Sequence, residues 1–164
     1  FINARYRAIY EEQGVAVDTI LAVQAIAPHM PLDFDERIHA VEAFRSLDEA
    51  VPLSQNNKRV ANILAKADVE VSDSVNDGLL AEPAEIALYK ALQNAKQITA
   101  PMSQQADYQG ILTTLASLDK PLTDFFDNVM VNADDVALKN NRLALLKQVR
   151  TLFLMVADIG LLQG

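Results

Sequence analysis

The apolar residues of this chain recur at helical spacing, and this pattern restricts its fold more than any other feature. The chain shows no sustained alternation of apolar and polar residues. The chain holds only five glycines, and Ala and Leu dominate its composition, which favours helices over sheets. We therefore predict an all-α fold with a bundle-like core.

Capping, turn and proline residues divide the chain into predicted helices. These helices cover roughly residues 2–13, a short stretch after 18, 33–47, 54–67, 83–100, 103–117, a short stretch from 121, and 134–159. Gly14 closes the first helix, the Ala27–Pro31 stretch breaks the chain after the second, and Pro101 stops the fifth. Asp134 and Asp135 cap the last helix, which is predicted to be the longest.

We predict two parts: an N-terminal helical segment, residues 1–50, and a helical domain, residues 51–164. The chain starts with Phe1 inside a helical pattern, so we expect it to be a piece of a longer protein. Residues 1–50 then either belong to the same fold or end a preceding domain. Residues 68–82 are acidic and turn-prone, which predicts a loop or a mobile excursion with its clearest turn at Asn76-Asp77-Gly78.

Residues that could carry out catalysis or hold a metal are scarce. Cysteine is absent, which excludes disulfides and thiolate sites, and His29 and His39 lack nearby acid pairs. Helix capping explains the acidic cluster of Asp33, Asp35 and Glu36. The sequence also lacks a glycine-rich phosphate loop, a nucleophile elbow and a helical His-Glu-x-x-His. We expect no catalytic residue, no cofactor and no metal in this chain.

Membrane insertion is not expected either. The longest apolar stretch, near the C-terminus, is interrupted by Asp158 and is shorter than the roughly 20 residues that a membrane span needs. The chain opens with no leader resembling a signal peptide, and the absence of cysteine is compatible with a reducing compartment. We therefore expect a soluble, cytoplasmic protein without a membrane partner.

Basic residues gather in two segments although the net charge is −8. Residues 54–67 and 139–150 hold seven of the 14 Lys and Arg residues and none of the 22 Asp and Glu residues. Nucleic-acid binding depends on such cations, because they displace counterions from the phosphates. An RNA partner is therefore compatible with the negative net charge. The alternative interpretation is that the two basic segments form a solvated surface.

Helical spacing places the basic residues of each segment on the helix surface. In the first segment, Lys58, Asn62 and Lys66 recur every fourth residue, with Arg59 beside them. In the second, the stem of Arg142 can pack at the edge of the apolar stripe while its guanidinium reaches outward. The candidate RNA-binding residues are Lys58, Arg59, Asn62, Lys66, Lys139, Asn141, Arg142, Lys147 and Arg150.

An aromatic pair is the other candidate contact to RNA. Phe125 and Phe126, together with Met130, could form a platform on which unpaired bases stack. Their spacing before a helix start favours packing in the core instead.

Two runs of residues resemble helices of a known tRNA-binding domain. Residues 134–162 resemble the closing helix of the anticodon-binding domain named for its Asp-Ala-Leu-Arg (DALR) motif, found in arginine–tRNA ligases and relatives. The motif stands here in a degenerate form, Val136-Ala137-Leu138-Lys139. Residues 56–67 resemble the helix that also faces the tRNA in those enzymes.

Six runs are similar, in the same order, to the beta subunits of the bacterial tetrameric glycine–tRNA ligases. They are residues 7–15, 31–44, 56–67, 82–92, 121–135 and 134–162. The resemblance spans nearly the whole chain. It implies a C-terminal anticodon-binding domain of the DALR type, a helical bundle with additional N-terminal helices.

The resemblance also implies the role of the parent enzyme. Such an enzyme is an alpha-2 beta-2 tetramer that attaches glycine to tRNA-Gly, and its alpha subunit holds the active site that uses ATP with Mg²⁺. This chain would have no activity by itself and would bind the anticodon, in which glycine tRNAs share two cytosines. Its expected partners are tRNA-Gly, the alpha subunit and the rest of the beta subunit.

As a hypothesis, the two basic helices flank one groove for RNA, and the acidic remainder repels RNA elsewhere. The alternative is a helical protein-interaction module that serves subunit assembly without direct RNA contact. A stand-alone enzyme is a third class, which the lack of catalytic constellations opposes.

Overall fold

The computed structural model describes residues 2–26 and 31–162, and within these residues it contains helices and no strands. The α-helices are α1 (Ile2–Glu12), α2 (Val17–Gln24), α3 (Pro31–Phe44), α4 (Ala50–Ala65), α5 (Pro83–Gln104), α6 (Tyr108–Leu115), α7 (Asp119–Asn128) and α8 (Val136–Leu154). Short 3-10 turns occur at η1 (Asp77–Leu79), η2 (Ala116–Leu118) and η3 (Ile159–Leu161). The predicted all-α fold is confirmed.

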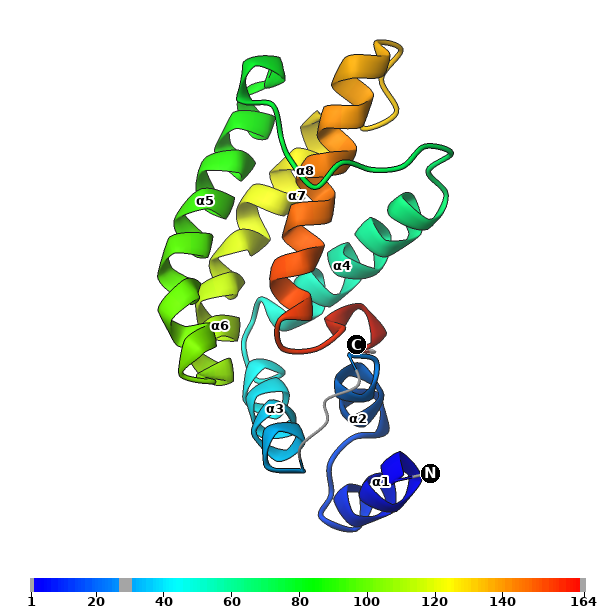
Figure 1. Ribbon diagram of the computed structural model, residues 1–164, viewed down its shortest axis with the longest axis vertical. Helices are drawn as coiled ribbons and strands as arrows, with labels where there is room; N and C mark the ends of the chain where they lie inside the picture. Colours follow the sequence, from blue (N-terminus) through cyan, green and yellow to red (C-terminus); the bar gives the residue numbers. More distant parts are fainter. Residues whose placement is uncertain (1, 27–30, 163–164) are drawn as a thin grey trace.

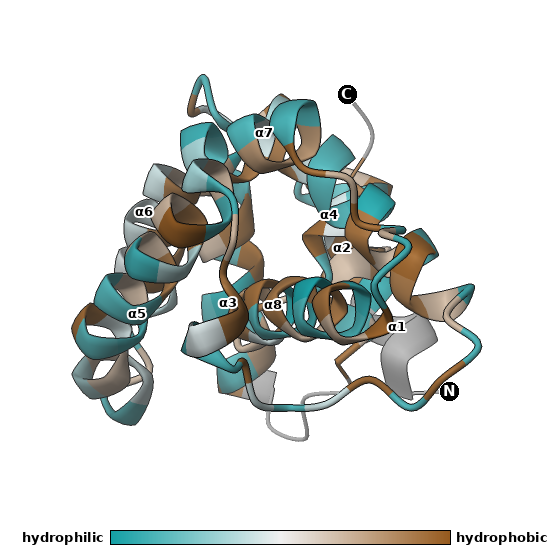
Figure 2. Cartoon of the chain, turned by 90° about the horizontal axis from the view of Figure 1, so that it is seen from above, coloured by the Kyte–Doolittle hydropathy of each residue, from teal (hydrophilic) through white to brown (hydrophobic). Residues whose placement is uncertain are grey.

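The long helices α5 and α8 run along the molecule, with α6 and α7 beside α5 and with α4 crossing near α8 (Figure 1). The helices α1 to α3 lie at one end, where α3 packs on α6 and α2 packs on η3. Seen from above, α5 and α6 lie at one edge and α1 and α2 at the opposite side, and the helices carry both hydrophilic and hydrophobic residues (Figure 2). Each helix therefore turns an apolar side to a shared interior.

The interior is one hydrophobic cluster that extends from Tyr10 of α1 to the residues after α8. Its fully buried large side chains include Ile20, Ile38, Phe44, Leu53, Leu88, Leu92, Phe125 and Phe153. Residues of α2 and α3 thus share their core with α4 to α8. The domain boundary at residue 50 stays a prediction.

An arginine of α3 joins the N-terminal helices to the rest of the molecule. Arg37 donates to the backbone oxygens of Met155 and Val156, at 2.6 and 2.9 Å, and to the Tyr108 hydroxyl at 3.0 Å. Asp33 accepts hydrogen bonds from Arg37 and from the Tyr108 hydroxyl. Burial alone would raise the pKa of Asp33, but these two hydrogen bonds and the Arg37 charge outweigh it, so the pKa lies below its ordinary value.

Several predicted helix ends shift in the structure. Gly14 follows α1 with a φ of +86°, so its predicted role at the end of the first helix is confirmed. Helix α4 begins at Ala50 rather than at Ser54, and Pro52 is accommodated in the first turn, where no intrahelical amide bond is lost. The Ser54 hydroxyl donates to the Ala50 oxygen at 2.7 Å instead of capping the helix.

The prediction that Pro101 stops the fifth helix is wrong. Helix α5 continues through Pro101 to Gln104 and is the longest described helix, with 22 residues against 19 for α8. Pro101 lies in the last turn, so its missing amide hydrogen costs at most one intrahelical bond there. The helix ends where Ala106 adopts a φ of +54°, and Asp107 then caps α6 by accepting from the Gly110 amide.

Candidate nucleic-acid interface

The outer face of α4 presents the first group of predicted residues to solvent. Lys58, Arg59, Asn62 and Lys66 are all exposed, as predicted, whereas Leu53 and Val60 on the opposite side are buried. No ion pair within residues 2–26 and 31–162 involves a cation of this face. These cations are therefore open to an anionic partner. We call the four residues the α4 face.

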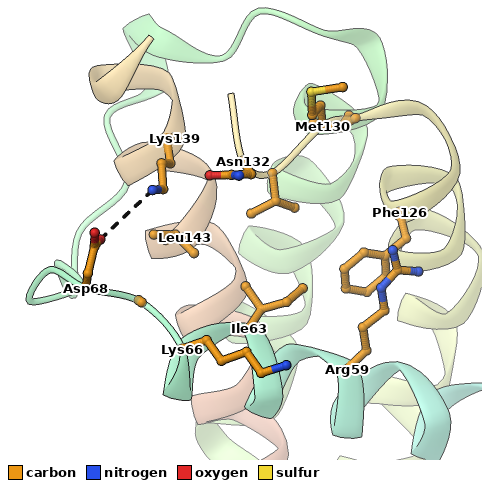
Figure 3. Close-up of a pocket in the computed structure, with 12 residues that line it drawn as sticks. Arg59, Ile63, Lys66, Asp68, Phe126, Met130, Asn132, Lys139 and Leu143 are labelled. Carbon is orange, nitrogen blue, oxygen red and sulfur yellow. Dashed lines mark ion pairs between the residues drawn. The ribbon is translucent and has the colours of Figure 1, made fainter. Parts of the chain in front are cut away.

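A pocket of about 550 Å³ opens beside the α4 face, between α4, the end of α7, the segment after it and α8 (Figure 3). Its lining consists of Arg59, Ile63, Lys66, Ala67, Asp68, Phe126, Val129, Met130, Val131, Asn132, Lys139 and Leu143. Three cations thus surround an interior lined by both apolar and polar side chains. The volume lies within the roughly 300–1,000 Å³ that is usual for small-molecule sites.

One side of the pocket is an arginine stacked on an aromatic ring. The guanidinium carbon of Arg59 lies 4.3 Å from the centroid of the Phe126 ring, a cation–π contact that orients the arginine. Phe125 is fully buried, which confirms core packing for that residue, whereas Phe126 is half-buried and lines the pocket. Met130 is 72% exposed and lines it too. The predicted aromatic pair is therefore divided between core and surface.

The prediction that the Arg142 guanidinium reaches outward is wrong. Only 6% of the Arg142 side chain is exposed, and its Nη2 donates to the fully buried Glu85 of α5 at 2.8 Å. Its Nη1 donates to the Met130 backbone oxygen at 2.6 Å. The burial of Glu85 explains this placement, because a buried carboxylate requires a cationic partner. Arg142 thus holds the segment that carries Met130 and is closed to RNA.

Asn141 is also turned inward. Its side-chain oxygen accepts from the Asn76 amide at 2.7 Å, and its side-chain nitrogen donates to the Asn76 backbone oxygen at 3.0 Å. Asn76 belongs to residues 67–82, which cross α8 in Figure 1 and which we call the strap. The side chain of Asn141 bonds to the strap backbone and is buried, so it does not lie on the surface where the prediction placed it.

The remaining cations of α8 have acidic partners from elsewhere in the chain. Lys147 pairs with Asp73 of the strap at 2.7 Å, and Arg150 pairs with Asp158 at 3.1 Å. Only Lys139, with its nitrogen 4.0 Å from Asp68, shares the pocket with the α4 face. Of the α8 cations in the single-groove hypothesis, only Lys139 therefore lies beside the pocket, and the groove for RNA stays a prediction.

Two polar lining residues could not be predicted from the sequence. Asp68 was assigned to an acidic loop, and Asn132 lies in the segment between α7 and α8. Neither residue belongs to a spacing pattern, so no sequence signal marked them. The strap and the packing of α7 on α4 bring them to the pocket.

His39 takes no part in this site. His39 is exposed and its Nδ1 lies 3.2 Å from Asp35, one turn earlier on α3. His29 lies outside the described residues. No described helix combines the length and apolar character that crossing a bilayer requires.

Comparison with known proteins assigns this fold to a family. The family model described as the DALR anticodon binding domain matches residues 53–158. The chain therefore belongs to the DALR anticodon-binding domain family, and the resemblance seen in the sequence is confirmed.

Proteins of one name are similar to this chain over its whole length. Over 164 residues the chain is 53% identical to the glycine–tRNA ligase beta subunit of Acinetobacter baumannii (strain AYE). It is 54% identical over 163 residues to the protein of the same name from Shewanella sp. (strain ANA-3), and 53% identical over 164 residues to that from Acinetobacter baylyi. The alignments cover 99–100% of this chain but only 24% of each relative. The chain thus spans about a quarter of the length of the relatives it matches.

Proposed function

We propose that this chain binds the anticodon of tRNA-Gly through the α4 face and the adjoining pocket. The observation that carries the proposal is a set of exposed cations, Lys58, Arg59 and Lys66, beside a pocket with an arginine–aromatic stack. None of the three has an acidic partner in the part of the chain that the structure describes. Membership of the DALR family gives this surface its expected ligand.

The α4 face and the pocket would bind RNA through different contacts. Cations of the α4 face would contact backbone phosphates, which position the RNA without reading its sequence. Each phosphate contact to a single strand contributes a slope of about −0.7 to the dependence of log affinity on log salt. Three contacts therefore predict a slope of about −2. The pocket would take an unstacked base, as single-stranded recognition requires.

The parent enzyme suggested by the relatives is a glycine–tRNA ligase that attaches glycine to tRNA-Gly in an ATP-dependent reaction. Its chemistry, with ATP and Mg²⁺, would take place in the alpha subunit of an alpha-2 beta-2 tetramer in the cytoplasm. The present chain would supply tRNA binding and no catalytic group. Its protein partners would be the alpha subunit and the rest of the beta subunit.

The test is the affinity of the 164-residue chain for tRNA-Gly and for the same tRNA with its two anticodon cytosines replaced, each at two salt concentrations. We expect binding that weakens with salt and with the replacement. Equal binding to both tRNAs would refute anticodon reading and leave electrostatic attraction alone. Absence of binding would refute the RNA function and favour the protein-interaction module.

A further inference from the structure

We propose that Asp68 makes the pocket selective for a base that carries an exocyclic amino group, cytosine rather than uracil. This inference rests on the proposed RNA function and assigns the selectivity to one side chain. Asp68 lines the pocket, and its side chain is 82% exposed. It is the single carboxylate in a lining that holds three cations.

The carboxylate of Asp68 is available to a ligand. Its nearest cationic atom, the Lys139 nitrogen, lies 4.0 Å away, which is too far for a hydrogen bond. A carboxylate acts only as an acceptor when ionised. Asp68 therefore offers free acceptor positions at the pocket, beside a lysine that offers donors.

The position of Asp68 argues for contact with a base rather than with phosphate. A carboxylate repels phosphate, so an acid beside Lys66 and Lys139 weakens backbone binding at that point. Figure 3 shows Asp68 and Lys139 toward one side of the pocket, the Arg59–Phe126 stack on the other, and Asn132 between them along the upper edge. A base held in this pocket has a surface for stacking and a polar wall for its edge.

Cytosine and uracil carry different hydrogen-bonding groups at one position of the base edge. The amino group of cytosine donates to a carboxylate, whereas uracil presents a carbonyl oxygen at the same place and repels it. A hydrogen bond to a charged group is stronger than a neutral one. We expect at least about a tenfold preference for cytosine, the size that the loss of one such bond implies.

The experiment compares Asp68→Asn with the unchanged chain on tRNA-Gly and on versions in which each anticodon cytosine is replaced in turn by uracil. An asparagine amide can turn either its donor or its acceptor to the base, so it accepts both pyrimidines. We expect the preference for cytosine at one of the two positions to fall from about tenfold to within about twofold. Affinity for tRNA-Gly should change little, because the variant also removes a repulsive charge.

Asp73→Asn is the matched control. Asp73 belongs to the same strap and is 88% exposed, but it pairs with Lys147 and does not line this pocket. The control removes the same charge without removing a contact to the base, so it should raise overall affinity slightly and leave the cytosine preference intact. The stability of both variants, measured by urea unfolding, should stay close to that of the unchanged chain.

Two results would overturn the assignment without touching the proposed function. One is an undiminished cytosine preference in Asp68→Asn, and the other is an equal loss in Asp73→Asn. Absence of salt-sensitive RNA binding by the unchanged chain would instead refute the proposed function, and this inference with it.

Discussion

Replacing Arg142 by Met is expected to destabilise the fold by about 3–5 kcal/mol, the cost of leaving a buried charge without its partner. The structure supports the upper part of this range. Glu85 is 0% exposed and would lose its one cationic partner, and the Met130 backbone oxygen would lose its donor. A loss of this size is a large part of the 5–15 kcal/mol that typically stabilises a domain.

A double variant distinguishes the loss of the whole ion pair from the cost of leaving one buried charge without its partner. One oxygen of Glu85 and the Nε of Arg142 are buried without a hydrogen-bond partner within the described residues, so the pair is incompletely satisfied. The double variant Glu85→Met/Arg142→Met removes both charges and should lose no more than about 1–2 kcal/mol. Part of that loss is the helix-capping bond from the Glu82 amide to Glu85, which measures 3.0 Å.

The assay is urea unfolding followed by circular dichroism. With a slope of about 2 kcal/mol per molar urea, the Arg142→Met midpoint should fall by about 1.5–2.5 M. A fall in stability below about 1 kcal/mol together with weaker tRNA binding would refute the reasoning. Arg142 would then be a surface residue that contacts RNA, as its sequence position suggested.

Three further predictions concern acid stability, the strap and the pocket. Burial raises the pKa of Asp33, but the hydrogen bonds from Tyr108 and Arg37 and the charge of Arg37 outweigh burial and lower it. The stability that the ionised Asp33 contributes is therefore present above pH 3.8 and is lost as the pH falls through the lowered pKa. Urea midpoints should show the advantage over Asp33→Asn shrinking from pH 7 to pH 3. Asn141→Ala should cost about 1–3 kcal/mol by removing both bonds to the strap and should speed amide exchange there, with little effect on RNA affinity. Phe126→Leu should lower tRNA affinity about three- to tenfold in a binding titration, because it removes the ring beneath Arg59, and unchanged affinity would exclude a stacking role.

The α4 face could be predicted from the sequence because its pattern is local. Lys58, Asn62 and Lys66 follow the helical repeat, and no acid occurs between residues 54 and 67 to pair with them along the helix. The apolar positions of α4 repeat with the same period. Local spacing therefore determined both which side is buried and which is exposed.

The α8 residues could not be predicted in the same way, because their partners are distant in the sequence. Arg142 pairs with Glu85, 57 positions away, and Asn141 bonds to Asn76, 65 positions away. A segment without acids looked like an open basic surface, but the fold supplies acids from α5, the strap and the chain after α8. Local charge patterns cannot reveal such pairing.

The pocket could not be predicted from the sequence either, because it forms only in the tertiary structure. It combines residues from α4, α7 and α8 with the strap, and its polar wall includes Asp68 and Asn132, which no periodic pattern marks. The relation of Arg59 to Phe126 follows from the packing of α7 on α4. Sequence reasoning identified some members of the site but not its shape.

The most direct test of the account is the salt dependence of tRNA-Gly binding after removal of two charges from the α4 face. The double variant Lys58→Ala/Lys66→Ala should reduce the slope of log affinity against log salt by about 1.4, two single-strand phosphate contacts. The matched control Lys90→Ala/Lys120→Ala removes the same charge from α5 and α7, away from the pocket lining, and should keep the slope of the unchanged chain. An unchanged slope in the α4 variant, or an equal fall in the control, would contradict RNA binding at the α4 face.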